Sequence, residues 1–243
     1  MEMFISPYVK FGFERIFGQL EHKSILISFL NAVFEGEYHV DDVLYKDASV
    51  ITGPEEEQRV IHGIFCTYKD GTPLILELQN RDIVKALVER VQYFQSRAIV
   101  SEEETLDRWK HIPLFVYILD FVRDEFRGKL RTDLGMRPVT VTMGGEVVRG
   151  GDEASRDKEL FRMTFLQMPK FDKPESECST DLDKWLYILK NMASLDRIPW
   201  ADQNETFAEL AQVARLDSLT PEDRCAYEKS CEELREGMTA AAE

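Results

Sequence analysis

The chain of 243 residues is 44% hydrophobic and 11% aromatic, which is enough for a packed core and excludes a disordered composition. Its formal net charge of −15 argues against a broad nucleic-acid-binding surface, although it does not exclude a local basic groove. No apolar run approaches the roughly 20 residues that cross a bilayer, and the sequence shows neither a signal-peptide pattern nor a disulfide or zinc spacing among its four cysteines. We therefore expect a cytoplasmic protein with reduced thiols and no membrane partner.

Two helices are predicted near the N-terminus. Ser6-Pro7 is typical of a helix start, and apolar residues then recur at helical spacing as far as Gly18, which should end or bend the helix. A second helix is predicted from about Lys23, and Gly36 should terminate it.

The pattern then changes to a mixture of strands and helices. Asp70-Gly71 lies between two apolar stretches and is a strong hairpin signal. Gly144-Gly145 indicates a second hairpin. The predicted strands cover residues 40–45, 59–68, 73–79, 113–121, 138–143, 146–149 and 160–168, and a helix is predicted over 82–100.

The polar, turn-rich stretch at 169–179 suggests a boundary between a core, residues 1–172, and a helical C-terminal extension, residues 173–243. The extension should begin with a helix capped by Thr180, with Asp183 placed as in a capping box. Helices at about 203–216 and 221–236 follow, and we expect the extension to pack on the core. This order predicts an α/β fold in which helices flank a mixed sheet.

The clearest functional signal is the apolar strand that ends in Glu77-Leu78-Gln79. Because side chains alternate along a strand, Glu77 and Gln79 lie on the same face of the sheet. Two polar groups there are costly to bury unless they are used. A carboxylate that holds Mg²⁺, beside an amide that orients the attacking water, suits phosphodiester hydrolysis. The alternative is a strand end at which both side chains reach solvent.

Several short motifs extend this signal along residues 5–235. They are Ser6-Pro7 before Phe13-Glu14-Arg15-Ile16-Phe17-Gly18, Asp70-Gly71 before Glu77-Leu78-Gln79, Tyr93-Phe94 with Arg97, Tyr117-Ile118-Leu119-Asp120-Phe121, and Asp181-Leu182-Asp183-Lys184-Trp185-Leu186-Tyr187. In these motifs the chain resembles the PD-(D/E)XK nuclease family transposases, also called recombination-promoting nucleases. The resemblance implies a restriction-endonuclease-like core, which is a mixed sheet flanked by helices. It also implies that the protein cleaves DNA with Mg²⁺.

The resemblance also implies that Glu77 is a metal ligand and that Gln79 acts beside it, together with an aspartate on the preceding strand. That aspartate position falls on Gly63, which offers no side-chain oxygen. Mg²⁺ in proteins commonly relies on one or two carboxylates plus water and substrate phosphate. We therefore predict a Mg²⁺-dependent DNA endonuclease, weakened at Gly63. The alternative is a non-catalytic DNA- or protein-binding regulatory protein that retains the nuclease fold.

Two residues are candidates for an accessory role. The family usually has an acid at the position of Lys10 and a lysine at that of Glu14, so Glu14 could bring a carboxylate towards the site or simply make a surface contact. His62 adjoins the gap, but it should face away from Glu77 unless Gly63 marks a bulge. An imidazole suits Mn²⁺ or Zn²⁺ better than Mg²⁺.

DNA contacts are expected from a few basic residues. Arg97 matches the family's arginine after the aromatic pair, and its alternative is a solvated charge on a helix. The only basic-leaning stretch contains Arg123, Arg127, Lys129 and Arg131, which could contact the DNA backbone or form a solvated loop. The sequence leaves the oligomeric state open, a homo-oligomer included.

Overall fold

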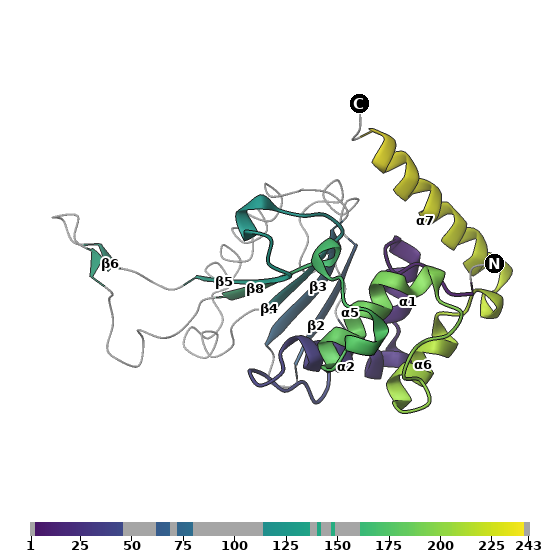
Figure 1. Cartoon of the computed structure of the whole chain (residues 1–243), viewed down its shortest axis with the longest axis horizontal. Helices are drawn as coiled ribbons and strands as arrows, with labels where there is room; N and C mark the ends of the chain where they lie inside the picture. The colour runs from purple at the N-terminus through teal and green to yellow at the C-terminus, as the bar shows by residue number, and fades with distance from the viewer. Residues whose placement is uncertain are drawn as a thin grey trace, which may run out of the picture.

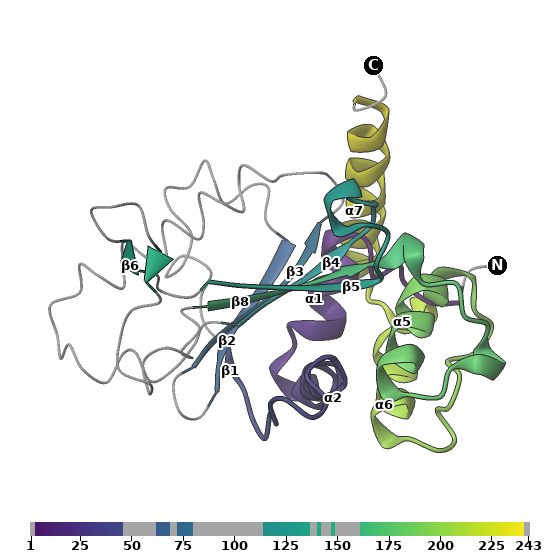
Figure 2. The same cartoon turned by 60° about the vertical axis from the view of Figure 1, so that its left-hand side comes forward.

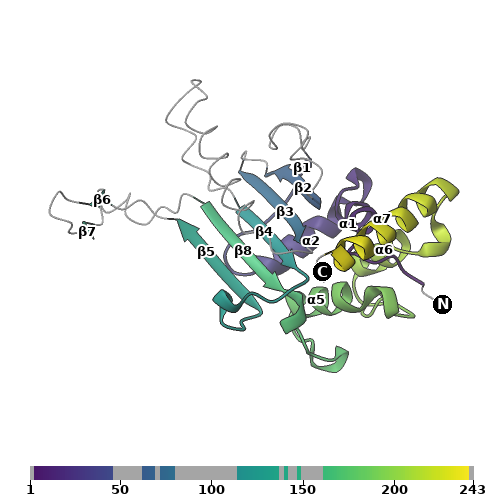
Figure 3. The ribbon, with the colours of Figure 1, turned by 90° about the horizontal axis from the view of Figure 1, so that it is seen from above.

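The computed structural model describes residues 3–45, 62–68, 72–79, 114–136, 140–141, 147–148 and 161–240. Its centre is a six-stranded sheet with the strand order β1-β2-β3-β4-β8-β5 (Figures 1 and 3). Helices from both ends of the chain lie together on one side of this sheet (Figure 2). Within the described part, no helix combines the length and the apolarity that a bilayer crossing requires. The α/β fold with a mixed sheet flanked by helices is confirmed.

The N-terminal helices are α1, Lys10–Phe17, and α2, Lys23–Val33. Gly18 ends α1, and Gly36 turns the chain after α2 with a φ of 79°, as predicted. The predicted start of α1 at Ser6-Pro7 is wrong.

The segment before α1 is held in an extended form by the C-terminal part of the chain. The Ile5 N–H donates to the Ala214 carbonyl at 2.9 Å, and the Ser6 N–H donates to the Tyr227 hydroxyl at 3.0 Å. These long-range hydrogen bonds fix the path of residues 5 and 6 against the C-terminal part of the chain, and α1 starts after them, at Lys10.

The strands are β1 Leu44–Tyr45, β2 His62–Thr67, β3 Pro73–Gln79, β4 Leu114–Leu119, β5 Arg131–Met136, β6 Thr140–Val141, β7 Val147–Val148 and β8 Phe161–Gln167. The β2–β3 and β5–β8 pairs are antiparallel, whereas β3–β4 and β4–β8 are parallel. Both predicted hairpin pairings are confirmed, the second as the separate β6–β7 pair. The strand predicted at 40–45 is shorter, and the predicted helix at 82–100 lies outside the described residues.

Strand β5 had no counterpart among the predicted elements, because Arg131 had been placed in a basic loop. The strand lies at the edge of the sheet and pairs only with β8 among the described strands. Its sequence lacks regular apolar alternation, and Leu134 is 46% exposed. An edge strand of this kind gives little periodic signal in the sequence.

The two faces of the sheet bury different side chains. The helix-covered face carries aliphatic residues such as Ile64, Leu76 and Val116, which join one core with the buried residues of α1 and α2. The opposite face, called the aromatic face below, forms a second cluster. Its members are Phe65, Ile75, Phe115, Tyr117, Leu119, Met163 and Phe165.

The C-terminal helices are α5 Asp181–Asn191, α6 Glu205–Val213 and α7 Pro221–Ala240. Short 3₁₀ helices connect the main elements: η1 Leu20–His22, η4 Asp124–Phe126, η5 Met168–Lys170, η6 Glu175–Glu177, η7 Met192–Ser194 and η8 Leu216–Ser218. The capping box of Thr180 and Asp183 at the start of α5 is confirmed. Trp185 of α5 packs against Phe29 of α2 and Phe207 of α6, with ring centroids 5.6 and 5.1 Å apart. The extension therefore shares its core with α1 and α2, while the boundary at 172/173 stays a prediction.

Candidate active site

The β2–β3 hairpin places Gly63 directly opposite Glu77. The pairing runs without interruption from His62 and Leu78 to Thr67 and Pro73, so Gly63 does not sit in a bulge. Directly opposed residues of antiparallel strands share a face, with α-carbons about 4.5–5.5 Å apart. An acid at position 63 would therefore lie beside Glu77, whereas position 62 belongs to the other face.

The side chain of Glu77 is buried and does not reach bulk solvent. Its exposed fraction is 1%, and its position on β3 shares the aromatic face with Ile75. In the neighbouring strand it is in register with Tyr117, which is fully buried and stacks on Phe165 at 5.0 Å between ring centroids. A buried carboxylate is costly unless hydrogen bonds, an opposite charge or a cation compensate it. A metal ion is one of the groups that such a position can serve.

The parallel strands end together just beyond Glu77. Gln79 of β3 is in register with Leu119 of β4, which is in register with Gln167 of β8. Ligands of open α/β sheets commonly bind outside the carboxyl ends of the strands. The backbone of Gln79 thus lies at this edge, on the same face as Glu77, while its side chain is outside the described part.

A sequence comparison supplies the decisive observation. The model of the PD-(D/E)XK nuclease family transposases matches residues 7–241, which is nearly the whole chain. This protein belongs to that family. No curated protein and no solved structure shows a significant match.

PD-(D/E)XK nucleases generally use divalent metal ions, so the donor set of this family member decides whether an ion fits. Among the residues with described structure, no group of three or more His, Cys, Asp and Glu side chains is arranged to hold a metal ion. Glu77 supplies one buried carboxylate, and Gly63 supplies no side-chain oxygen. One carboxylate with water and substrate phosphate is the smallest usual set for Mg²⁺. The described residues therefore meet only the minimum for a metal site.

Neither accessory candidate, Glu14 or His62, occupies a position opposite Glu77 as Gly63 does. Helix α1 buries Phe13, Ile16 and Phe17 in the core of the helix-covered face, so Glu14 belongs to a helix on the opposite side of the sheet from Glu77. Burial raises the pKa of Glu14, and attraction to Lys10 lowers it by a smaller amount. His62 pairs with Leu78, and its side chain lies outside the described part.

The basic candidates of this nuclease-family chain differ in their surroundings. Arg97 lies outside the described residues. Arg123 is buried, forms an ion pair with Glu125 at 2.9 Å and covers the ring of Phe126. Arg127 and Lys129, by contrast, are exposed.

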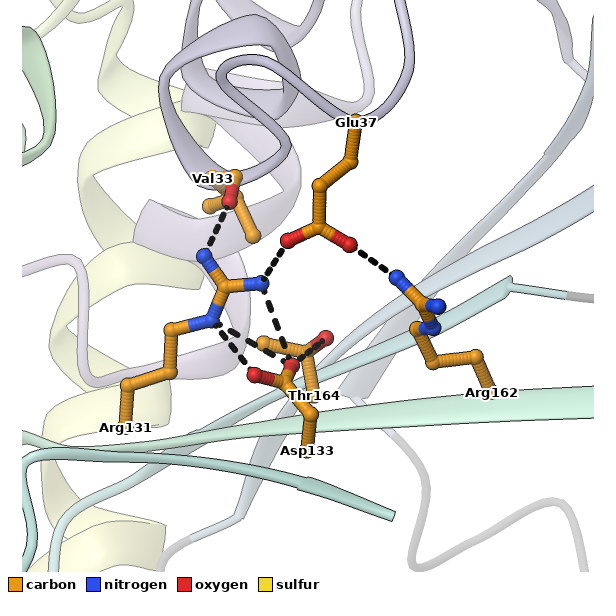
Figure 4. A network of polar contacts seen from close by, with 6 residues as sticks. All are labelled: Val33, Glu37, Arg131, Asp133, Arg162 and Thr164. Atoms are coloured by element: carbon orange, nitrogen blue, oxygen red, sulfur yellow. Dashed lines mark hydrogen bonds and ion pairs between the residues drawn. The ribbon is translucent and has the colours of Figure 1, made fainter. Parts of the chain in front are cut away.

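Arg131 is the centre of a polar network rather than part of a loop (Figure 4). Its guanidinium donates to the Val33 carbonyl at the end of α2 at 2.7 Å, to Glu37 at 2.9 Å and to Asp133 at 2.9 Å. The second carboxylate oxygen of Glu37 accepts a hydrogen bond from the guanidinium of Arg162. The network joins the end of α2 to β5 and β8, which gives Arg131 a structural function.

Replacing Arg131 with methionine is therefore expected to lower the free energy of unfolding by about 1–2 kcal/mol. The estimate is at the lower end for charged hydrogen bonds because the partners Glu37 and Asp133 are 38% and 40% exposed. Urea unfolding measures the change, and Arg127→Gln, an exposed arginine, serves as the control within about 0.5 kcal/mol of wild type. Wild-type stability of Arg131→Met, combined with weakened DNA binding, would contradict this expectation.

Two residues near the carboxyl edge of the sheet carry no signal in the sequence. Gln167 is fully buried at the end of β8, and Lys170 follows it in η5. A glutamine at the end of an apolar strand, as at Gln79, was the feature that could have pointed to Gln167.

Proposed function

We propose that this protein is a divalent-metal-dependent DNA endonuclease whose metal site is weakened by glycine at position 63. Family membership supports the reaction class, because the family is one of nuclease-like transposases. Gln79 and Glu77 would act together at the carboxyl edge of the sheet.

The observation that carries this proposal is the opposed pair of Gly63 and Glu77. The two positions face each other across one antiparallel pair, which is the arrangement that lets two acids share one ion. Here one of the two positions is Gly63, which has no side-chain oxygen to bind the ion. Disturbing even the hydrogen-bonding partners of a ligand typically lowers metal affinity or activity about 10–100-fold, so losing a ligand should lower them at least as much.

In this proposal Glu77 holds the ion, Mg²⁺ or Mn²⁺, through its carboxylate. A bound ion lowers the pKa of water and neutralises phosphate charge. Gln79, the next residue on that face of β3, accepts a hydrogen bond from the attacking water or donates one to a phosphate oxygen. The rings of Tyr117 and Phe165 exclude water from the inner side of Glu77 and so strengthen its electrostatic interactions.

A second candidate is a non-catalytic DNA- or protein-binding regulatory protein that retains the fold. Gly63 is the observation that favours it, because a single missing ligand removes much of the metal affinity and leaves the buried core unchanged. The two candidates differ in one property, which is metal-dependent cleavage.

The experiment is incubation of purified protein with supercoiled plasmid in Mg²⁺, Mn²⁺ or EDTA, with Glu77→Ala beside the wild type. We expect slow nicking that needs the metal and disappears in Glu77→Ala, while DNA binding measured in EDTA is retained. Cleavage that is unaffected by Glu77→Ala would overturn the site. DNA binding with no cleavage in either metal would support the regulatory candidate instead.

A further inference from the structure

A buried glutamine organises the loop beyond the carboxyl edge of the sheet. The side-chain oxygen of Gln167 accepts the Arg123 N–H at 2.6 Å, and its amide nitrogen donates to the Lys129 carbonyl at 2.5 Å. Its backbone N–H donates to the Leu130 carbonyl at 2.8 Å. Gln167 therefore fixes both ends of the segment 123–130, called the 123–130 loop below.

The loop is also anchored on the aromatic face. The ring of Phe126 lies 4.9 Å from that of Phe165, and Phe165 lies 5.0 Å from Tyr117. Tyr117 is in register with Glu77 on the adjacent strand. A continuous row of rings thus connects the loop to the neighbour of the candidate metal ligand.

The turn of the loop is strained at an arginine. Arg127 has a φ of 49° and Gly128 a φ of 69°. Glycine adopts this conformation freely, but a left-handed arginine costs of order 1 kcal/mol or more and persists only where its surroundings fix it. The hydrogen bonds of Gln167 on either side supply that constraint.

Three exposed cations gather on this turn. Arg127 and Lys129 flank Gly128, and Lys170 of η5 places its Nζ 3.9 Å from where a β-carbon on Gly128 would lie. Asp124 and Glu125 are exposed within the same loop, and Asp172 is exposed just after η5. The cations therefore form a local contact rather than a broad basic surface, in keeping with the net charge of −15.

We propose that Arg127, Lys129 and Lys170 bind the backbone phosphates of the DNA whose scissile bond lies at Glu77, and that Gln167 is the positioning residue for this platform. The inference rests on the proposed function. It adds Lys170 to the expected contacts and assigns Arg123 and Arg131 to structural ion pairs.

The spacing suits one continuous backbone. Two strand intervals separate β3 from β8, which is about 10 Å. A DNA strand carries one phosphate per roughly 3.4 Å of axis, so a backbone bound at Glu77 crosses from β3 to β8 in about three nucleotides and continues to the platform beyond the end of β8. Contacts of this type position DNA and do not read its sequence.

The test measures binding of two unrelated labelled duplexes in EDTA over a salt series. The variant combines Lys129→Ala with Lys170→Ala, and the control combines Arg197→Ala with Lys229→Ala, which are exposed cations of the C-terminal extension. We expect the platform variant to bind both duplexes about 25-fold more weakly at low salt, about fivefold per lysine. The slope of log affinity against log salt should fall by about two, while the control changes both far less.

Gln167→Met tests the positioning function. It removes no charge, so a merely structural effect leaves the salt slope unchanged, whereas loss of the platform lowers it by about two. If this variant fails to fold, the lysine variant still decides.

The binding test distinguishes failure of this inference from failure of the proposed function. Equal affinity of the platform and control variants would overturn this inference and leave the proposed function standing. Absence of DNA binding by the wild type at low salt would overturn both.

Discussion

Gly63→Asp is expected to raise metal-dependent plasmid cleavage at least 10–100-fold over the wild type. The substitution supplies a carboxylate directly opposite Glu77, in an extended strand whose backbone conformation does not require glycine. Two carboxylates on one face bind Mg²⁺ better than one, and they hold the ion where substrate phosphate completes its coordination. The measurement is the initial rate of plasmid nicking in Mg²⁺ under identical conditions.

The matched control is Gly63→Asn, which has nearly the same size and no charge. It should leave cleavage near the wild-type rate, so that a gain in Gly63→Asp reports the carboxylate rather than a stiffer strand. In the double variant Gly63→Asp with Glu77→Ala the gain should disappear. A Gly63→Asp protein that is folded and cleaves no faster than Gly63→Asn would contradict the assignment of position 63.

Trp185→Ala is expected to lower the free energy of unfolding by about 3–5 kcal/mol. Trp185 is 1% exposed and lies among rings from α1, α2 and α6. Truncation leaves a large cavity where the C-terminal extension meets the N-terminal helices, and the surrounding rings cannot close it. Denaturant unfolding, monitored by far-UV circular dichroism, measures the change in the free energy of unfolding.

Leu20→Ala is the control, because Leu20 is 64% exposed and its loss should change stability by less than about 0.5 kcal/mol. The unfolding curve also tests how the extension is organised. A shared core predicts one cooperative transition that moves as a whole. Two separate transitions, with only one displaced by Trp185→Ala, would show that residues 173–243 fold independently.

The fold could be predicted where local pattern and tertiary structure agree. Strand β3 and the capping box at Thr180 carry strong local signals, and both were predicted at the correct residues. The start of α1 was not, because the hydrogen-bond partners that fix the preceding residues Ile5 and Ser6 lie more than two hundred residues away in the sequence. Strand β5 was missed because an edge strand needs no apolar alternation.

The candidate site, like the fold, could be predicted only in part from the sequence. The resemblance to the family placed its aspartate position at Gly63, on the strand before Glu77, and the observed register puts Gly63 opposite Glu77. The partners of Arg131 could not be predicted, because Glu37 is 94 positions away and only the folded sheet brings the two together. The functions of Gln79, His62 and Arg97 stay predictions, since their side chains lie outside the described part of the chain.

The opposed pair in the β2–β3 hairpin also has a genetic consequence. Every glycine codon is a single base change from a codon for aspartate or glutamate, so position 63 is one point mutation from an acidic residue. Because position 63 is already opposite the buried Glu77, that mutation alone places two acidic residues on one face of the hairpin. In the proposed function, a single base change at this codon would therefore supply the second carboxylate of the metal site.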